Sequence, residues 1–106
     1  MITGDLTVTL GMDALIATAT KDRIPVFSTL PLAVGRGAFF AMGTDYYQIG
    51  RQTGDLAARV LGGEEPKRIP IDYSFPKKIA LNPGVLPKLK GNWLIPADVA
   101  AQAAKQ

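Results

Sequence analysis

Gly43-Thr44-Asp45-Tyr46-Tyr47-Gln48-Ile49-Gly50 is the stretch that decides the fold, because an apolar strand ends there and a helix begins. The five residues before it, Ala38–Met42, form a continuous apolar run that Gly43 ends. After it, Tyr46–Leu61 places apolar and small residues at helical spacing. Thr44 or Asp45 supplies a side-chain cap for the first turn. The pattern predicts a strand, a turn and a helix of an α/β domain.

The predicted helix Tyr46–Leu61 ends at Gly62-Gly63, because glycine readily adopts the left-handed conformation that closes helices. Gly50 and Gly54 lie inside it, and each costs about 1 kcal/mol relative to alanine. Such a cost predicts close backbone packing of this helix against a strand.

The chain before the opening stretch is predicted to contain a helix and a strand. Apolar residues at helical spacing indicate a helix from about Thr9 to Lys21, capped by Thr7 or Thr9. Ile24–Phe27 is a short apolar run that suits a buried strand. Because this run and Ala38–Met42 are continuous rather than alternating, we expect a parallel or mixed sheet covered on both faces.

The chain after the helix is predicted to return through two short strands. Ile69–Tyr73 alternates like a half-buried edge strand, the position in a sheet where proline is tolerated. Lys78–Asn82 is a second strand, followed by the turn signal Asn-Pro-Gly. The Ala-rich segment from Pro96 to Gln106 predicts a final helix.

Composition limits the chain to one domain with one core, since 106 residues is a common single-domain size. We find neither an internal repeat nor a linker, so residues 1–106 are interpreted as a single domain. A domain of this size buries only about two-thirds of the surface that its unfolded chain exposes, so its size is compatible with further burial against a partner subunit. No secretory signal is expected at the N-terminus, and no apolar run has the length of a membrane span.

The residue content excludes most catalytic chemistries. Without cysteine or histidine, the chain has no thiolate nucleophile, no Ser-His system and no Cys/His metal site, so no metal or cofactor is expected. Two acid pairs are rejected. Asp45 and Asp55 are about 15 Å apart along a helix, and Glu64-Glu65 lies in a loop. Only carboxylate, lysine or tyrosine chemistry remains, so an enzyme is the least supported class. The net charge is +3, but the basic residues are not interleaved with the aromatic residues that nucleic-acid binding needs.

The order of motifs carries a resemblance to a known family. The motifs are Gly4 to Val8, Ala14-Leu15, Ile24 to Ser28, Arg36-Gly37-Ala38, Gly43 to Gly50, Ala57 to Gly63, Pro66, Ile69-Pro70 and Ile79 to Asn82. In this order they resemble the later part of ABC transporter substrate-binding proteins of the type I periplasmic-binding superfamily. The nearest likeness is to the branch that takes up tryptophan and tyrosine.

The resemblance implies an α/β fold, with Rossmann-like three-layer partial lobes of a type I periplasmic-binding protein. This chain would supply the last third of such a protein. The segment up to about Phe40 would belong to the second lobe and the helix Tyr46–Leu61 to the first, with Ile69–Leu81 crossing between them. It also implies a small amino-acid-like ligand bound between the lobes without chemistry, a permease as partner, and an extracytoplasmic location.

By the same resemblance, ligand contacts would come from Asp5, Thr7, Ser28 and Thr29, with Asp45 and Tyr46 near the hinge. A carboxylate such as Asp5 forms charge-assisted hydrogen bonds with a ligand's ammonium group. Asp5 is as typical of a helix cap as of a ligand contact, and Thr7 is more typical of a cap. Tyr46 with Tyr47 is typical of packing at a helix start. A second interpretation is a structural or assembly role, in which the chain forms a homodimer through unpaired strands and binds no ligand.

Overall fold

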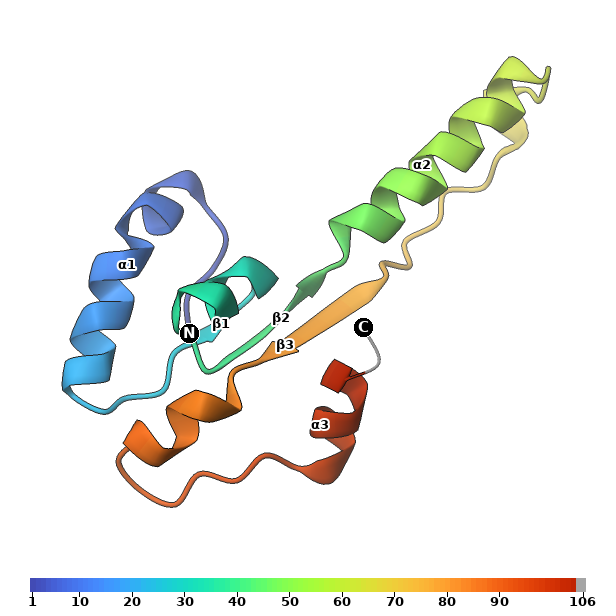
Figure 1. The fold of residues 1–106 in the computed structure, drawn as a ribbon. Coiled ribbons are helices and arrows are strands. Elements are labelled where there is room, and N and C mark those ends of the chain that lie inside the picture. The colour runs from blue at the N-terminus through green and yellow to red at the C-terminus, as the bar shows by residue number, and fades with distance from the viewer. Residues whose placement is uncertain (105–106) are drawn as a thin grey trace. The chain divides into compact units, whose positions relative to one another are not determined.

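The computed structural model describes residues 1–104, which divide into two compact units. The first unit contains residues 1–43 and the chain from Lys78 onward, and the second contains Thr44–Lys77. In chain order the elements are α1 (Leu6–Lys21), β1 (Phe27–Ser28), η1 (Pro31–Arg36), β2 (Phe40–Thr44), α2 (Tyr46–Leu61), η2 (Pro66–Arg68), β3 (Lys77–Leu81), η3 (Pro83–Lys88) and α3 (Ala97–Ala104), where η denotes a 3-10 helix (Figure 1).

A three-stranded mixed sheet in the order β1-β2-β3 organises the first unit. β1 pairs with β2 in parallel, with Phe27 opposite Phe40, and Ile2 adds a parallel bridge to Ser28 on the other side of β1. At the two ends of the β2–β3 pair, the Asp45 N–H donates to the Pro76 carbonyl and the Asn82 N–H donates to the Phe39 carbonyl. β2 and β3 therefore run in opposite directions, as Figure 1 shows.

Both faces of the sheet in the first unit carry apolar side chains. On one face, Val26 joins Met12 and Ile16 of α1 in a buried core, together with Ile2, Ala33 and Ala38. Because successive strand residues point to opposite faces, Phe27 lies on the other face, where its ring centroid is 6.0 Å from that of Trp93. This arrangement confirms the prediction of an α/β fold whose continuous apolar strands are covered on both sides.

The second unit consists of α2 and an extended return segment. The Asp45 carboxylate caps α2 by accepting hydrogen bonds from the N–H groups of Tyr47 and Gln48. Asp45 is one of the two residues predicted to cap this helix. The helix bounds are those that the sequence predicts. None of the residues in α2 is buried within the part of the chain that the structure describes.

The predicted start of α1 and its predicted threonine caps are wrong, whereas the alternative interpretation of Asp5 as a helix cap is confirmed. The helix begins at Leu6 rather than near Thr9, because the Asp5 carboxylate accepts a 2.8 Å hydrogen bond from the Val8 N–H. Thr7 and Thr9 therefore lie inside the first turns. The Thr9 hydroxyl donates to the Asp5 carbonyl instead of capping the helix.

Two predictions in the second unit are also wrong. Ile69–Tyr73 forms no strand, since Pro70 lacks an N–H and the Asp72 carboxylate accepts the Ser74 N–H in a local turn. Side chains added at Gly50 and Gly54 would meet no atom of the described chain within 4 Å, apart from the helix's own nearby backbone. The close packing predicted from these glycines is therefore absent from residues 1–104.

The remaining strand predictions are confirmed with small shifts. β1 and β2 begin later than the apolar runs Ile24–Phe27 and Ala38–Met42, and β3 begins at Lys77 rather than Lys78. The short helical turn of η1 lies in the loop between the first two strands. The last helix is confirmed from Ala97 to Ala104, and its predicted last two residues lie outside the described residues.

Gly43 is required by a close approach at the end of β2, so Gly43→Ala is expected to destabilise the protein. An added Cβ would overlap the Thr29 carbonyl and lie 2.8 Å from the Pro31 Cδ. A backbone carbonyl has little freedom to move aside, so we expect a loss of about 2 kcal/mol. Urea unfolding followed by circular dichroism measures the change.

Gly11→Ala is the matched control, because Gly11 lies inside α1 and an added Cβ there meets nothing within 4 Å. It should stabilise the protein by about 0.5–1 kcal/mol through helix propensity. Equal effects of the two substitutions would contradict the close approach at Gly43.

Candidate functional site

The first unit presents two different edges of its sheet. We call the edge where β1 and β2 begin the amino edge, and the edge where they end the carboxyl edge. Because β3 is antiparallel to β2, Asn82 follows β3 at the amino edge.

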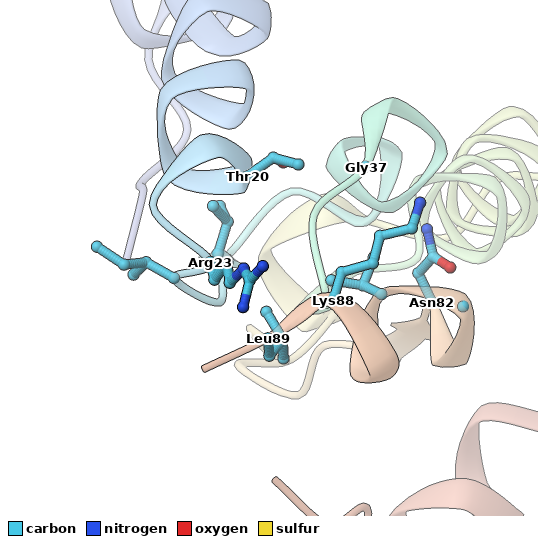
Figure 2. Close-up of a pocket in the computed structure, with 10 residues that line it drawn as sticks. Thr20, Arg23, Gly37, Asn82, Lys88 and Leu89 are labelled. Carbon is cyan, nitrogen blue, oxygen red and sulfur yellow. The ribbon is translucent and has the colours of Figure 1, made fainter. Parts of the chain in front are cut away.

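A cavity of about 280 Å³ lies at the amino edge (Figure 2). The end of α1, the entries to β1 and β2, and the segment around η3 contribute to its wall. The lining residues are Thr20, Arg23, Ile24, Val26, Gly37, Asn82, Gly84, Val85, Lys88 and Leu89. Its two charged lining residues are both basic, and neither has an ion-pair partner among residues 1–104. Sequence reasoning missed this cavity, because its walls come together only in the folded unit.

The carboxyl edge brings together the loop that leads into α1 and the loop that follows β1. The Ile2 N–H donates to the Phe27 carbonyl at 2.8 Å, and the Thr29 N–H donates to the Ile2 carbonyl at 3.1 Å. A Cβ added at Gly4 would lie 2.7 Å from the Leu30 Cδ2, so the two loops touch. The structure therefore places the loop of Asp5 next to Ser28 and Thr29.

The side chains at the carboxyl edge differ in how they are engaged. The Ser28 side chain is buried, and its Oγ accepts a 3.0 Å hydrogen bond from the Leu30 N–H. Thr29 and Thr7 are exposed. Asp5 serves as the cap of α1, which leaves a second carboxylate oxygen that is able to accept further hydrogen bonds.

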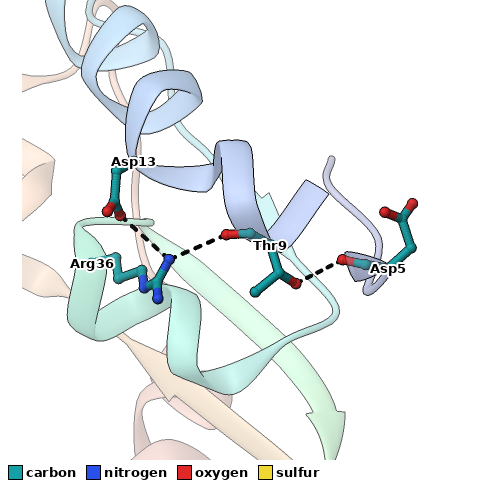
Figure 3. Close-up of polar contacts among 4 residues, drawn as sticks. All are labelled: Asp5, Thr9, Asp13 and Arg36. Carbon is teal, nitrogen blue, oxygen red and sulfur yellow. Dashed lines mark hydrogen bonds and ion pairs between the residues drawn. The ribbon is translucent and has the colours of Figure 1, made fainter. Parts of the chain in front are cut away.

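The last turn of η1 is tied to α1 by Arg36. Its Nη1 donates to the Thr9 carbonyl at 3.3 Å and lies 3.5 Å from an Asp13 carboxylate oxygen. Figure 3 shows these contacts, with the Asp5 carboxylate pointing away from Arg36. Arg36 is thus engaged in holding α1 to the loop between β1 and β2, and it leaves Asp5 without a basic neighbour in this group.

The remaining predicted site residues belong to the second unit. The Asp45 carboxylate caps α2 at 3.1 and 3.2 Å, and Tyr46 is 72% exposed. Their role as ligand contacts stays a prediction. Among residues 1–104, no three His, Cys, Asp or Glu side chains gather as a metal site requires, and no helix has the length and apolarity needed to cross a membrane.

The second unit has a groove of its own, with a volume of about 730 Å³. α2 contributes Ile49, Gln52, Thr53, Asp55, Leu56 and Arg59, and the return segment contributes Pro66, Ile69, Pro70, Ile71, Asp72, Ser74 and Phe75. The apolar members Ile71 and Phe75 are 78% and 63% exposed, so the groove is an apolar surface open to solvent.

The model of the family described as ABC transporter substrate binding protein matches residues 1–106, so the chain belongs to that family. A similar solved structure is that of a conserved domain protein from Vibrio cholerae O1 biovar eltor, with a TM-score of 0.71 and 34% identity. The match covers 95% of this chain and 33% of the other, so the chain spans about a third of that protein's length. A search of curated proteins finds no match.

The end of α2 is held by a bidentate ion pair whose strength depends on pH. Arg59 donates to both Glu64 carboxylate oxygens, at 2.7 and 2.6 Å. These hydrogen bonds lower the pKa of Glu64 below its ordinary value. The pair therefore stabilises the folded state fully above the unfolded-state pKa of Glu64, near 4.3, and this contribution is lost as the pH falls through the lower folded-state pKa.

We expect acid to loosen the last turn of α2 in the native protein, measured by the Cα chemical shifts of residues 60–63. Glu64→Gln should show the loosened shifts already at neutral pH and no further step in acid. Glu65→Gln is the control, because Glu65 pairs with Lys67 and Arg68 instead. A Glu64→Gln variant that still shows the acid step would refute the assignment of this step to Glu64.

Proposed function

We propose that this chain is the C-terminal third of a two-lobed substrate-binding protein of an ABC importer, which holds a small amino-acid-like ligand between its lobes without chemical conversion. Family membership over residues 1–106 supports the binding role. The one-third share of the related structure supports the assignment as part of a longer protein. An importer permease is then the partner, and the location is extracytoplasmic.

The division into two units supports the assignment of chain segments to lobes. The first unit, with α1 and most of the sheet, would belong to one lobe, and the second unit, with α2, to the other. The boundaries at Gly43 and Lys78 fall where the resemblance expects the chain to cross between lobes. We interpret residues 1–106 as one C-terminal portion without an internal linker. Within the family, we propose that the chain is most similar to the branch that takes up tryptophan and tyrosine.

The carboxyl edge of the first unit is the observation that carries the proposal. Open α/β sheets bind ligands outside the carboxyl ends of their strands, where backbone N–H groups are not used by the sheet. Here this edge joins the loop of Asp5 to the loop of Ser28 and Thr29. Arg36, the basic residue of the group that holds α1 to η1, pairs with Asp13 and not with Asp5.

The chemistry of this edge suits an amino-acid-like ligand. The Asp5 carboxylate would accept hydrogen bonds from the ligand ammonium, a charge-assisted contact. Exposed hydroxyls at Thr7 and Thr29 would donate to the ligand carboxylate. Ser28 would act chiefly by shaping the loop, since its Oγ already accepts the Leu30 N–H. Asp45 and Tyr46 are proposed as further contacts from the second unit.

Asp5→Asn separates ligand binding from folding, because asparagine caps a helix about as well as aspartate. In the complete two-lobed protein, titration calorimetry with aromatic and branched amino acids should give binding that Asp5→Asn weakens by about tenfold or more. The midpoint of urea unfolding should stay near that of the native protein.

Asp13→Asn is the matched control, since Asp13 is an exposed carboxylate on the same helix that faces Arg36 rather than the carboxyl edge. It should leave the affinity unchanged. Absence of binding heat with every amino acid tested, or equal weakening by both variants, would refute the proposed ligand class and contact.

The alternative function is a structural or assembly role in which two copies of this chain form a homodimer. The exposed apolar surface of the second unit favours it, because Leu61, Ile71 and Tyr73 are 88%, 78% and 77% exposed. Apolar surface of this kind usually marks an interface. In the two-lobed protein, the rest of the longer chain would cover it.

The apolar surface of the second unit is covered either by a second copy of this chain or by the rest of a longer chain, and light scattering on the 106-residue chain distinguishes the two. The homodimer predicts twice the monomer mass, and Ile71→Asp should return it to the monomer mass because it places a charge in the apolar groove. Lys67→Asp, at a neighbouring exposed position outside the groove, should leave the dimer intact. A monomeric mass of the native chain at all concentrations would exclude the homodimer.

A further inference from the structure

The cavity at the amino edge lies at the end of the sheet opposite to the proposed amino-acid site. Val26 precedes β1, Gly37 precedes β2, and Asn82 follows the antiparallel β3, so all three mark the amino edge. Of the proposed ligand contacts, Ser28 ends β1 and Thr29 follows it, so both mark the carboxyl edge. A ligand in this cavity would therefore occupy a separate site, and its binding does not depend on the proposed function.

Arg23 lines the cavity, and its backbone has a left-handed conformation that glycine usually adopts. Its φ is 57°, and it follows the last turn of α1. The Arg23 N–H donates to the Thr20 carbonyl and the Ile24 N–H donates to the Ala19 carbonyl, which together form a Schellman closure of the helix. Glycine is the usual residue at this position of such a closure, because a side chain there is strained. The arginine side chain at this position therefore carries a cost in backbone strain.

The same backbone position brings a second cation to the wall of the cavity. The Arg23 carbonyl accepts a 2.9 Å hydrogen bond from the Lys90 N–H, which ties the end of α1 to the segment after η3. Lys88, the last residue of η3, lies two positions before this bond and lines the cavity. No acidic residue is among the lining residues, so two positive charges share the wall without a carboxylate.

The rest of the wall limits the kind of anion that fits. Ile24, Val26, Val85 and Leu89 give the cavity an apolar side, and Val26 is only 8% exposed. Asn82 and Thr20 add an amide and a hydroxyl that are able to donate hydrogen bonds. Figure 2 shows Thr20 and Arg23 at the end of α1 and Lys88 and Asn82 on the segment after β3, around the same space.

We propose that the amino-edge cavity binds a small organic acid with a short hydrocarbon body, held through its carboxylate by Arg23 and Lys88. The guanidinium pairs with a carboxylate through two parallel hydrogen bonds, and the lysine ammonium adds a point charge. The hydrocarbon body packs on the apolar side of the cavity. A free amino acid is disfavoured, because its ammonium would meet two cations and no acceptor carboxylate.

Titration calorimetry of the 106-residue chain with 4-methylpentanoate tests this site. We expect saturable binding that is at least about tenfold tighter than binding of leucine, of inorganic phosphate or of the neutral 4-methylpentanamide. Leucine has the same hydrocarbon body with an added ammonium, phosphate has charge without the body, and the amide has the body without charge. Absence of saturable binding, or equal affinity for any of the three comparison ligands, would overturn the proposal.

Arg23→Gly separates the role of the side chain from that of the backbone. Glycine suits the left-handed position, so the midpoint of urea unfolding should stay equal or rise. Binding of 4-methylpentanoate should weaken about tenfold or more, as it should in Lys88→Gln.

Lys21→Gln is the matched control, because it removes a positive charge from the last turn of α1 outside the cavity. It should retain the native affinity within about twofold, since an exposed charge at a distance is screened by salt. Native affinity in Arg23→Gly, or equal weakening by Lys21→Gln, would show a diffuse effect of net charge and refute the site.

Discussion

The parallel pairing of β1 with β2, flanked by the bridge from Ile2, is the constraint on which the first unit depends. β1 contains only Phe27 and Ser28, yet its hydrogen bonds connect the N-terminus to the middle of the chain. Because side chains alternate across a strand, Val26 faces the core with α1 while Phe27 faces Trp93. This short strand therefore joins both layers that cover the sheet, and it sets the positions of the loops at both edges.

The two edges of this sheet carry opposite chemistry. The carboxyl edge presents a carboxylate and hydroxyl groups from Asp5, Ser28 and Thr29, and the amino edge presents the cations Arg23 and Lys88 beside an apolar wall. The two proposed ligands, one that bears an ammonium group and one that is a simple organic acid, would therefore meet complementary charge at different ends of the unit. The separation follows from topology, because parallel strands place all their starts at one edge and all their ends at the other.

The second unit illustrates how an amphipathic helix depends on what lies against it. α2 begins at a well-formed Asp45 cap and ends at the Arg59–Glu64 pair, so both of its ends are satisfied locally. Its side chains remain exposed in the described chain, and the groove beside it is apolar. Helix ends are local features, whereas burial of a helix face requires a second surface. The similar solved structure is about three times as long as this chain, so it contains further chain from which such a surface comes if the proposed two-lobed arrangement holds.

The sequence by itself determined the class of fold, the helix Tyr46–Leu61 with a cap at Thr44 or Asp45, and the resemblance to the family. These features depend on periodicity, capping residues and motif order, which a linear chain displays directly. Only the tertiary structure decided which of the candidate capping residues, strands and glycines have the predicted structural role. The carboxylate of Asp5 begins α1 in place of the threonines, Pro70 and Asp72 prevent a strand at Ile69–Tyr73, and Gly43 rather than Gly50 or Gly54 sits at a close approach. It alone brought Arg23 and Lys88 to the wall of one cavity, because residues so far apart in sequence come together only in the folded unit, where the Lys90 N–H donates to the Arg23 carbonyl.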